Sequence, residues 1–270
     1  MRGKSTFYVV LIAFIFSACG EYQKAVKSND ADFKYKVAKE LFEKEEYQKA
    51  YPLFDDLLIL YRGTEKAADV YWYYAETSFN LEDFILASYH YKNFAKTFPG
   101  HPKTEMAYYM VAYCYYLQSP VFSLDQTYTI KAINDFQLFA NLYPTSDKLL
   151  SANELIDELR AKLEMKSFER AKLYYRTSHF QAAVVAFNNV LDEFPDTEYR
   201  QELLYFRVLA AYRLADNSIE SKKLQRFIES RTAYREFLKL YPNSTFAAEV
   251  KELNSNIEET IALLKKNTNS

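Results

Sequence analysis

Glycine is scarce in this chain of 270 residues. Only four glycines occur, and they stand far apart, at Gly3, Gly20, Gly63 and Gly100. Phosphate-binding loops and dinucleotide-binding turns both need clustered glycines, so the sequence excludes nucleotide chemistry of those two kinds. With seven prolines and 17% aromatic residues, the composition predicts long helices rather than turn-rich sheets.

Side chains that bind metals or perform catalysis are also few. The chain has two cysteines and three histidines, and none of His90, His101 and His179 lies in a cluster with the spacing of a zinc site. His90 is expected at the polar edge of a helix, His101 in a turn, and His179 at a helix junction. We find no set of nucleophile, base and acid, so the sequence predicts no catalytic residue, no metal and no cofactor.

An excess of basic residues is missing as well. The net charge is -2, which leaves no positive field to hold nucleic acid. A content of 49% apolar and 26% charged residues is typical of a globular protein, neither disordered nor embedded in a membrane. Stability is therefore expected from packing.

The N-terminus has the pattern of an export signal. Arg2 and Lys4 precede an apolar run at 7–16, and small residues then lead to Cys19. The run is too short to span a bilayer. The ending Phe-Ser-Ala-Cys resembles a bacterial lipobox, which implies cleavage after residue 18 and acylation of Cys19. An ordinary signal peptide with an incidental cysteine is the alternative.

Acylation would have two consequences for the mature chain, which starts at residue 19 and has a net charge of -4. Each buried methylene contributes about 0.8 kcal/mol, so two or more acyl chains would hold the protein at the membrane. Residues 19–29 would form the anchor and a linker. Cys114 would have no partner for a disulfide, and its apolar helix favours a buried, unreactive thiol.

A repeated pattern runs through the rest of the chain. Five small residues are each followed four positions later by an aromatic residue: Ala50 and Phe54, Ala87 and Tyr91, Ala132 and Phe136, Ala183 and Phe187, and Ser230 and Tyr234. Twelve positions after each small residue stands Arg62, Pro99, Pro144, Pro195 or Pro242. This spacing predicts one face of a helix that ends near the proline.

A second helix precedes each of these. It carries an alanine, which is Ala38, Ala75, Ala112, Ala171 or Ala211 in the successive copies. Small residues at this spacing allow two antiparallel helices to pack closely. The pattern resembles the tetratricopeptide repeat. It predicts an all-α solenoid of about five helical hairpins over residues 30–243, closed by a capping helix in 244–270.

Two copies contain extra residues. In the third copy the excess falls at 119–129, which includes the apolar residues Val121, Phe122, Leu124 and Tyr128; in the fifth it falls at 215–223. A solvated loop would not keep such apolar side chains exposed. We expect them either to fold back onto their own repeat or to bind a partner.

A run of four aromatic residues occupies positions 71–74. Consecutive helical residues point in different directions, so these four cannot all face the core. Most aromatic residues of the chain are expected between repeats. For Trp72 and Tyr73, a place in a peptide-binding groove is the alternative to the core.

These features together resemble the BamD family of lipoproteins, in the form found in Bacteroidetes. The resemblance rests on the lipobox, the five repeats, the enlarged third repeat and the segment 123–146. It implies a scaffold in the outer membrane β-barrel assembly machinery, lipid-anchored and facing the periplasm. It also implies that repeats 1–2 (30–104) receive unfolded outer-membrane proteins, while repeats 3–5 (105–243) bind the POTRA region of a BamA-like barrel protein, beside possible further subunits.

The family resemblance also singles out Arg200 as a contact for the BamA-like partner. The family has an arginine after a Pro-Asp-Thr turn, and Arg200 follows such a turn here, one residue closer. If Thr197 is the N-cap, the helix dipole disfavours this cation by about 0.3–1 kcal/mol. An anion of the partner would relieve that, and so would the neighbouring Glu198 and Glu202.

Two other functions stay open at this point. A different periplasmic repeat lipoprotein, serving secretin assembly or envelope maintenance, would share the anchor and the repeats. An enzyme accessory or polysaccharide-binding lipoprotein would usually need longer inserted loops. The enlarged third repeat favours the BamD family over the other repeat lipoproteins.

Overall fold

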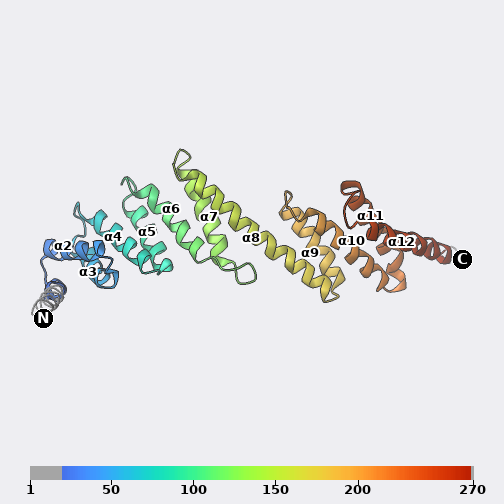
Figure 1. Ribbon diagram of the computed structural model, residues 1–270, viewed down its shortest axis with the longest axis horizontal. Helices are drawn as coiled ribbons and strands as arrows, with labels where there is room; N and C mark the ends of the chain where they lie inside the picture. Colours follow the sequence, from blue (N-terminus) through green and yellow to red (C-terminus); the bar gives the residue numbers. More distant parts are fainter. Residues whose placement is uncertain (1–19, 269–270) are drawn as a thin grey trace, which may run out of the picture. The chain divides into compact units, whose positions relative to one another are not determined.

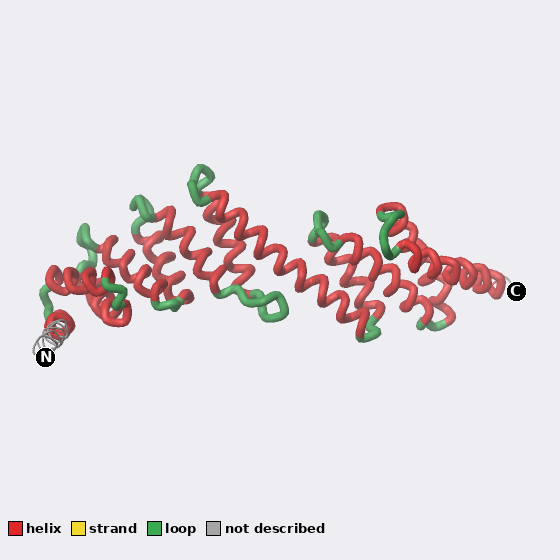
Figure 2. Tube along the Cα trace, viewed as in Figure 1, coloured by secondary structure: helices red, strands yellow, loops and turns green. Residues whose placement is uncertain are grey.

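The computed structural model describes residues 20–268, which consist of α-helices joined by turns, without a strand (Figures 1 and 2). The predicted all-α class is confirmed. The chain divides into two compact units, Met1–Arg160 and Ala161–Ser270, and their boundary lies inside the long helix α8 (Leu149–Arg176). This boundary is not the expected functional division at residue 104, which stays a prediction.

Unit 1 contains three helical hairpins. They pair α2 (Ala31–Glu43) with α3 (Tyr47–Leu60), α4 (Ala67–Asn80) with α5 (Phe84–Thr97), and α6 (Thr104–Leu117) with α7 (Thr127–Leu142). From α2 to α7, each helix contacts the next one along the chain, as in a solenoid. Residues 20–27, expected as a linker, are helical instead, because Tyr22 and Ala25 lie one turn apart and pack on the core of the unit.

Unit 2 continues the same architecture. The second half of α8 packs on α9 (Phe180–Glu193), and α10 (Arg200–Asp216) pairs with α11 (Glu220–Leu240). The last helix, α12 (Ala247–Thr268), contacts α10 and α11 and buries Ile257 and Ile261 against Phe227. The predicted solenoid of five hairpins with a C-terminal capping helix is confirmed.

Three of the hairpins share one tight turn. Glu45, Glu82 and Ser178 have left-handed φ angles of 60°, 60° and 61°, each in the middle of a three-residue connection. The next amide donates to a carbonyl five residues back, as from Glu46 to Leu41 at 2.9 Å. This geometry satisfies the last carbonyls of the first helix. These are the copies in which the two alanines stand 12 residues apart.

The two enlarged copies use their extra residues differently. In hairpin three they form a loop between α6 and α7. In hairpin five the connection is again three residues long, and the excess lengthens α11 to 21 residues. Sequence spacing alone does not separate a longer loop from a longer helix.

The prolines end the helices as predicted. Helices α5, α7, α9 and α11 each stop two residues before a proline. The residue between has an extended φ near -130° in each case, because the proline ring disfavours a helical conformation there. In the first copy α3 ends at the same relative place without a proline, and Gly63 reverses the chain with a φ of 78°.

The repeated small residues lie at the centre of the hairpins. None of the five is exposed: Ala50, Ala87, Ala132, Ala183 and Ser230. Four of the five paired aromatic residues are also fully buried, namely Phe54, Tyr91, Phe136 and Phe187. The fifth, Tyr234, is half-buried.

The Ser230 hydroxyl is buried without a hydrogen-bond partner among the described residues. We expect Ser230→Ala to raise the free energy of unfolding by about 1 kcal/mol, because it removes an unsatisfied polar group and favours the helix. Urea denaturation followed by circular dichroism measures this. Ser88→Ala is the control, since the Ser88 hydroxyl donates to the Ile85 carbonyl at 2.8 Å. Destabilisation by both variants would contradict the prediction.

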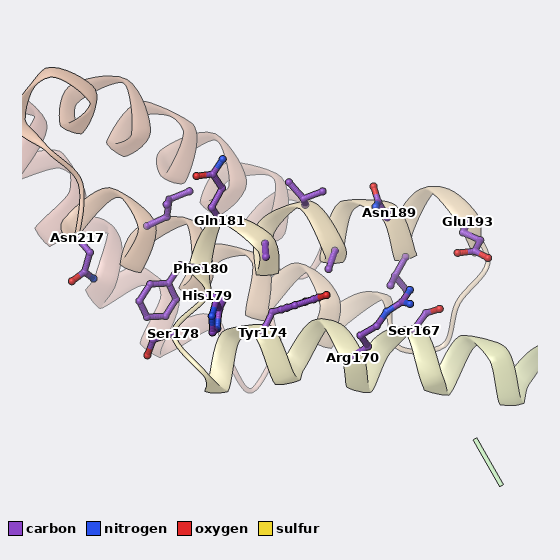
Figure 3. A pocket seen from close by; sticks show the side chains of 15 residues that line it. Ser167, Arg170, Tyr174, Ser178, His179, Phe180, Gln181, Asn189, Glu193 and Asn217 are labelled. Carbon is purple, nitrogen blue, oxygen red and sulfur yellow. The ribbon is translucent and has the colours of Figure 1, made fainter. Parts of the chain in front are cut away.

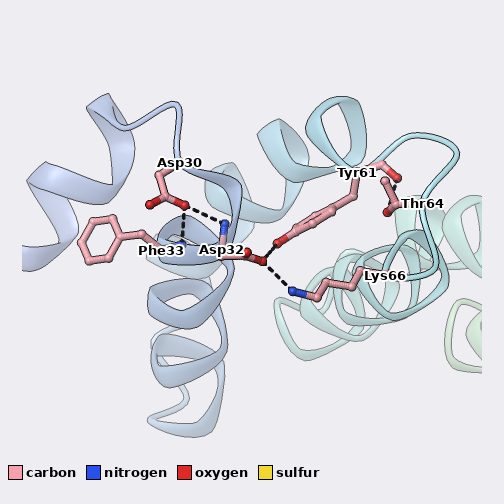
Figure 4. Close-up of polar contacts among 6 residues, drawn as sticks. All are labelled: Asp30, Asp32, Phe33, Tyr61, Thr64 and Lys66. Atoms are coloured by element: carbon pink, nitrogen blue, oxygen red, sulfur yellow. Dashed lines mark hydrogen bonds and ion pairs between the residues drawn. The ribbon is translucent and has the colours of Figure 1, made fainter.

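A polar network fastens the first hairpin of unit 1 (Figure 4). Asp30 caps α2, and its Oδ1 accepts from the amides of Asp32 and Phe33 at 3.0 and 3.1 Å. The Asp32 carboxylate accepts from the Tyr61 hydroxyl and from Lys66 Nζ, both at 2.5 Å. The hydrogen bond from Lys66, followed by the one from Tyr61, lowers the pKa of Asp32. The network thus joins the start of α2 to the connection between α3 and α4.

Candidate partner-binding surfaces

Tyr73 and Trp72 lie half-buried on α4, each held by other rings. The Tyr73 ring stacks on Phe54 at 5.5 Å and meets the edge of Phe42 at 5.2 Å. Trp72 meets Tyr91 at 5.5 Å and Phe94 at 5.4 Å. Part of each ring therefore packs between helices and part stays accessible, and a place of these rings in a peptide-binding groove stays a prediction.

Two lysines extend this aromatic surface. Lys39 Nζ of α2 lies 5.5 Å from the Tyr73 ring centre, and Lys103 Nζ lies 4.9 Å from the ring centre of Trp72 and 5.8 Å from that of Tyr73. An ammonium group is attracted to the face of an aromatic ring, and it can still bind a carboxylate of another molecule. The sequence prediction missed both lysines. Only Lys39 could have been found from the sequence, because it follows Tyr35 by one helical turn and such residues lie on the same face of a helix.

The insert of hairpin three is organised around a buried glutamine. Gln126 Nε2 donates to the carbonyls of Val121 and Leu124 at 3.0 Å, and its Oε1 accepts from the Thr129 hydroxyl at 2.6 Å. The loop therefore holds its shape by its own hydrogen bonds. Val121 remains 64% exposed, Leu124 57% and Phe122 36%. These three side chains have not folded into the core of their repeat.

Tyr128 differs from the other apolar residues of the insert. Its ring stacks on Tyr115 of α6 at 6.0 Å, and Lys131 Nζ lies 5.4 Å from Tyr115 and 5.2 Å from Tyr128. The aromatic pair with its cation thus packs onto hairpin three. Tyr128 is half-buried, so one of the four predicted contact residues contributes partly to the fold.

Arg200 is the first residue of α10, but the expected cap is wrong. The N-cap residue is Tyr199. Thr197 is instead buried, where its hydroxyl donates to Glu164 and accepts from the Tyr199 amide at 3.0 Å. The side chain of Thr197 therefore hydrogen-bonds to Glu164 of α8 and is not the N-cap of α10.

The Arg200 guanidinium donates from Nη1 to the Pro195 carbonyl at 2.9 Å. Among residues 20–268, no carboxylate forms an ion pair with it, although Glu198 and Glu202 are close in sequence. Arg200 lines a surface pocket of about 480 Å³ together with both of these glutamates. The cation is therefore half-exposed at a helix N-terminus, where a partner's anion would be favourable.

Comparison with known proteins now identifies the family. A family model described as "YfiO: Outer membrane lipoprotein" matches residues 27–224. The chain belongs to this family. The putative outer membrane protein assembly factor BamD of Aquifex aeolicus is 24% identical over 225 residues, which cover 82% of this chain and 73% of that protein. The assembly factor BamD of Rickettsia prowazekii is 24% identical over 183 residues, covering 68% and 72%.

This chain is also similar to the outer membrane protein assembly factor BamD of Caulobacter vibrioides. It is 27% identical over 130 residues, which cover 48% of this chain and 42% of that protein. The matched part is thus less than half of the Caulobacter protein. The predicted membership of the BamD family is confirmed by the family match and these relatives.

Of the two cysteines of this YfiO-family chain, the structure describes only Cys114. Cys19, the predicted lipidation site, lies outside the described residues. Cys114 is fully buried, and burial raises the pKa of its thiol to about 12, so it is unreactive as predicted. No helix within residues 20–268 has the length and apolarity to cross a membrane.

The histidines are distributed differently from the prediction. His90 is not at a polar edge but buried, 9% exposed, with its ring 4.2 Å from that of Tyr74. The face of α5 that carries His90 is covered by Tyr74 of α4, the other helix of the same hairpin. His101 lies in a turn as expected, where its Nδ1 accepts from the Lys103 amide at 3.1 Å. His179 is exposed at the junction of α8 and α9.

Proposed function

We propose that this chain is a non-enzymatic scaffold of the machinery that assembles β-barrel proteins in the outer membrane. The family match over residues 27–224 carries the proposal. The three relatives named above, all outer membrane protein assembly factors, support it. In this proposal the acylated Cys19 anchors the chain in the outer membrane, facing the periplasm.

Repeats 3–5 would bind the POTRA region of a BamA-like protein. Arg200 supports this, since its half-exposed guanidinium has no ion pair among the described residues and stands where an anion is favourable. The exposed Phe122 and Leu124 of the insert supply apolar area for the same or a further subunit. Tyr128, beside them, contributes its accessible edge.

Repeats 1–2 would receive unfolded outer-membrane proteins. Trp72 and Tyr73 support this because each presents part of an aromatic ring, next to the ammonium groups of Lys39 and Lys103. Such a surface can bind extended chains that are rich in aromatic residues and carry carboxylates.

The interface is tested by charge reversal at Arg200. We expect Arg200→Glu to reduce recovery of the BamA-like protein in affinity purification at least tenfold, since it places an anion where the partner presents one. Arg235→Glu is the matched control, because Arg235 is 66% exposed and makes only a long contact of 3.7 Å to Glu258. Unchanged recovery with Arg200→Glu would exclude it from the interface.

The anchor is tested by removing the thiol of Cys19. We expect Cys19→Ala to release the protein into the soluble periplasmic fraction, because its acyl chains supply the membrane affinity. Cys114→Ala keeps the lipid site and should stay in the membrane fraction. Fractionation and immunoblotting measure both, and membrane retention of Cys19→Ala would refute lipid anchoring.

A further inference from the structure

A short helix directly follows the predicted lipidation site. Residues 20–27 are helical and precede α2 (Figure 1). Tyr22 and Ala25 of this helix pack on a core cluster of α2, α3 and α4, and Ala25 is not exposed. The Ser28 amide donates to the Ala25 carbonyl at 3.2 Å, and the Asp30 amide donates to the Ser28 hydroxyl at 3.0 Å. The helix is therefore a fixed part of unit 1 rather than a free linker.

One peptide bond joins Cys19 to this helix. Across a trans peptide the Cα atoms of Cys19 and Gly20 are about 3.8 Å apart. An acylated Cys19 would thus hold unit 1 directly against the bilayer, because no flexible segment separates the lipid from the folded chain. The side of the helix that carries Gly20 would then lie next to the headgroups.

That side of the helix is polar and basic. Gln23 and Lys24 follow Gly20 by three and four positions, and Lys27 follows it by seven. Residues at this spacing lie on one face of a helix. All four are exposed, whereas the opposite face packs on the core of unit 1. The two lysines and the residue bonded to Cys19 therefore share the face that points away from the protein.

The two lysines have no anionic partner within the protein. Among residues 20–268, neither Lys24 nor Lys27 forms an ion pair. Measured from Gly20, Lys24 lies about 6 Å and Lys27 about 10 Å along the helix axis. These distances are comparable with the Debye length of about 8–10 Å at physiological salt, so both charges act on a surface located at the anchor.

Anionic phospholipid headgroups supply the missing counter-charge. The flexible ammonium groups of lysine bind phosphate as point charges, without the fixed geometry that arginine imposes, which suits mobile headgroups. Lysines close to an anionic membrane surface are attracted to it. Within residues 20–27, Glu21 is the one acidic residue, so the segment has a net charge of +1.

We propose, on the basis of the acylated Cys19 of the proposed function, that the helix 20–27 lies along the bilayer surface and that Lys24 and Lys27 bind anionic phospholipid headgroups. The acyl chains alone would hold unit 1 at one point and let it tilt about that point. The lysines add contacts on the same face, so they fix which side of unit 1 faces the bilayer and which side faces the periplasm.

Accessibility of a spin label in reconstituted vesicles tests this orientation. The acylated protein carries Gln23→Cys with a nitroxide label, since Cys19 is blocked by its lipid and Cys114 is fully buried. The vesicles contain phosphatidylethanolamine and phosphatidylglycerol and no other protein. Power saturation in electron paramagnetic resonance measures collisions of the label with a water-soluble nickel complex. We expect collisions at least about threefold less frequent than at an exposed control site, because the headgroups exclude the complex.

The matched control is Gln181→Cys, an exposed glutamine in unit 2 that lines an open surface groove along α8 and α9 (Figure 3). Lys24→Glu combined with Lys27→Glu should raise the collisions of the Gln23 label to the control level. Lys24→Arg combined with Lys27→Arg should not, since arginine keeps the charge. Replacing phosphatidylglycerol by phosphatidylcholine should have the same effect as the glutamates, because it removes the anionic headgroups.

Four results would overturn the proposal. They are equal collisions of the Gln23 and Gln181 labels, protection that survives the two glutamates, protection that survives in phosphatidylcholine, and protection found in native outer membranes but not in the vesicles. The last result would mean that another protein covers the face. Mass spectrometry shows whether Cys19 carries acyl chains; their absence would refute the anchor and this contact together, whereas an exposed label on an acylated protein refutes the contact alone.

Discussion

Phe187→Ala should lower the free energy of unfolding of unit 2 by about 3–5 kcal/mol, the range for deletion of a fully buried phenylalanine. The Phe187 ring is not exposed and lies in a core cluster with Phe168, Leu203 and Val208. Truncation would leave a cavity between three helices that cannot collapse without moving the hairpins apart. Urea denaturation followed by circular dichroism measures the loss.

The matched control for Phe187→Ala is Tyr234→Ala. Both residues occupy the same place in the sequence repeat, four positions after the small residue, yet Tyr234 is half-buried. We expect Tyr234→Ala to lose less than half as much stability, because less apolar area returns to water. Equal losses in the two variants would contradict the packing described for hairpin five.

Acid should destabilise unit 1 through His90. Burial lowers the pKa of His90 from 6.5 to about 4, against the opposing effect of the charges of Asp55 and Asp83. Between these two pH values the unfolded chain binds a proton and the folded chain does not. The contribution of His90 to the free energy of unfolding is therefore constant well above pH 6.5. It falls as the pH decreases, by about 3 kcal/mol at pH 4.

Comparison with His90→Leu isolates this contribution from that of the carboxylates. The Nε2 atom of His90 is buried without a hydrogen-bond partner among the described residues, so leucine removes an unsatisfied group and the proton site together. The variant should keep more stability than the wild type at pH 4.5, measured by urea denaturation across the pH range. His179→Leu, at an exposed histidine, should behave as the wild type. Parallel pH profiles of His90→Leu and the wild type would refute the assignment.

Most of the fold was predictable because its signals are local and repeated. A small residue at a fixed place, an aromatic residue one turn later and, in four of the five copies, a closing proline specify each second helix, and five repetitions make an accidental match improbable. Tyr234 has the same place in the repeat as the four buried aromatic residues, yet it is half-buried. Its burial depends on which neighbour lies beside α11, and no local pattern records that.

The candidate sites were less predictable for the same reason. Trp72 and Tyr73 were found from their neighbours in sequence, but Lys39 and Lys103 come to the same rings from α2 and from the start of α6. Thr197 looked like a helix cap, yet its hydroxyl is taken by Glu164, 33 residues earlier. The helical segment 20–27 and the buried His90 were missed because a face is polar or apolar only in relation to what covers it.

By itself, the sequence determined the helical class, the number of hairpins, the ends of the helices and the absence of clustered glycines, because each follows from steric or periodic rules acting over one or two turns. Only the tertiary structure decided whether extra residues lengthen a loop or a helix and which rings keep an accessible edge. Those properties depend on contacts between helices that are distant along the chain, and burial is a property of the pair rather than of either residue.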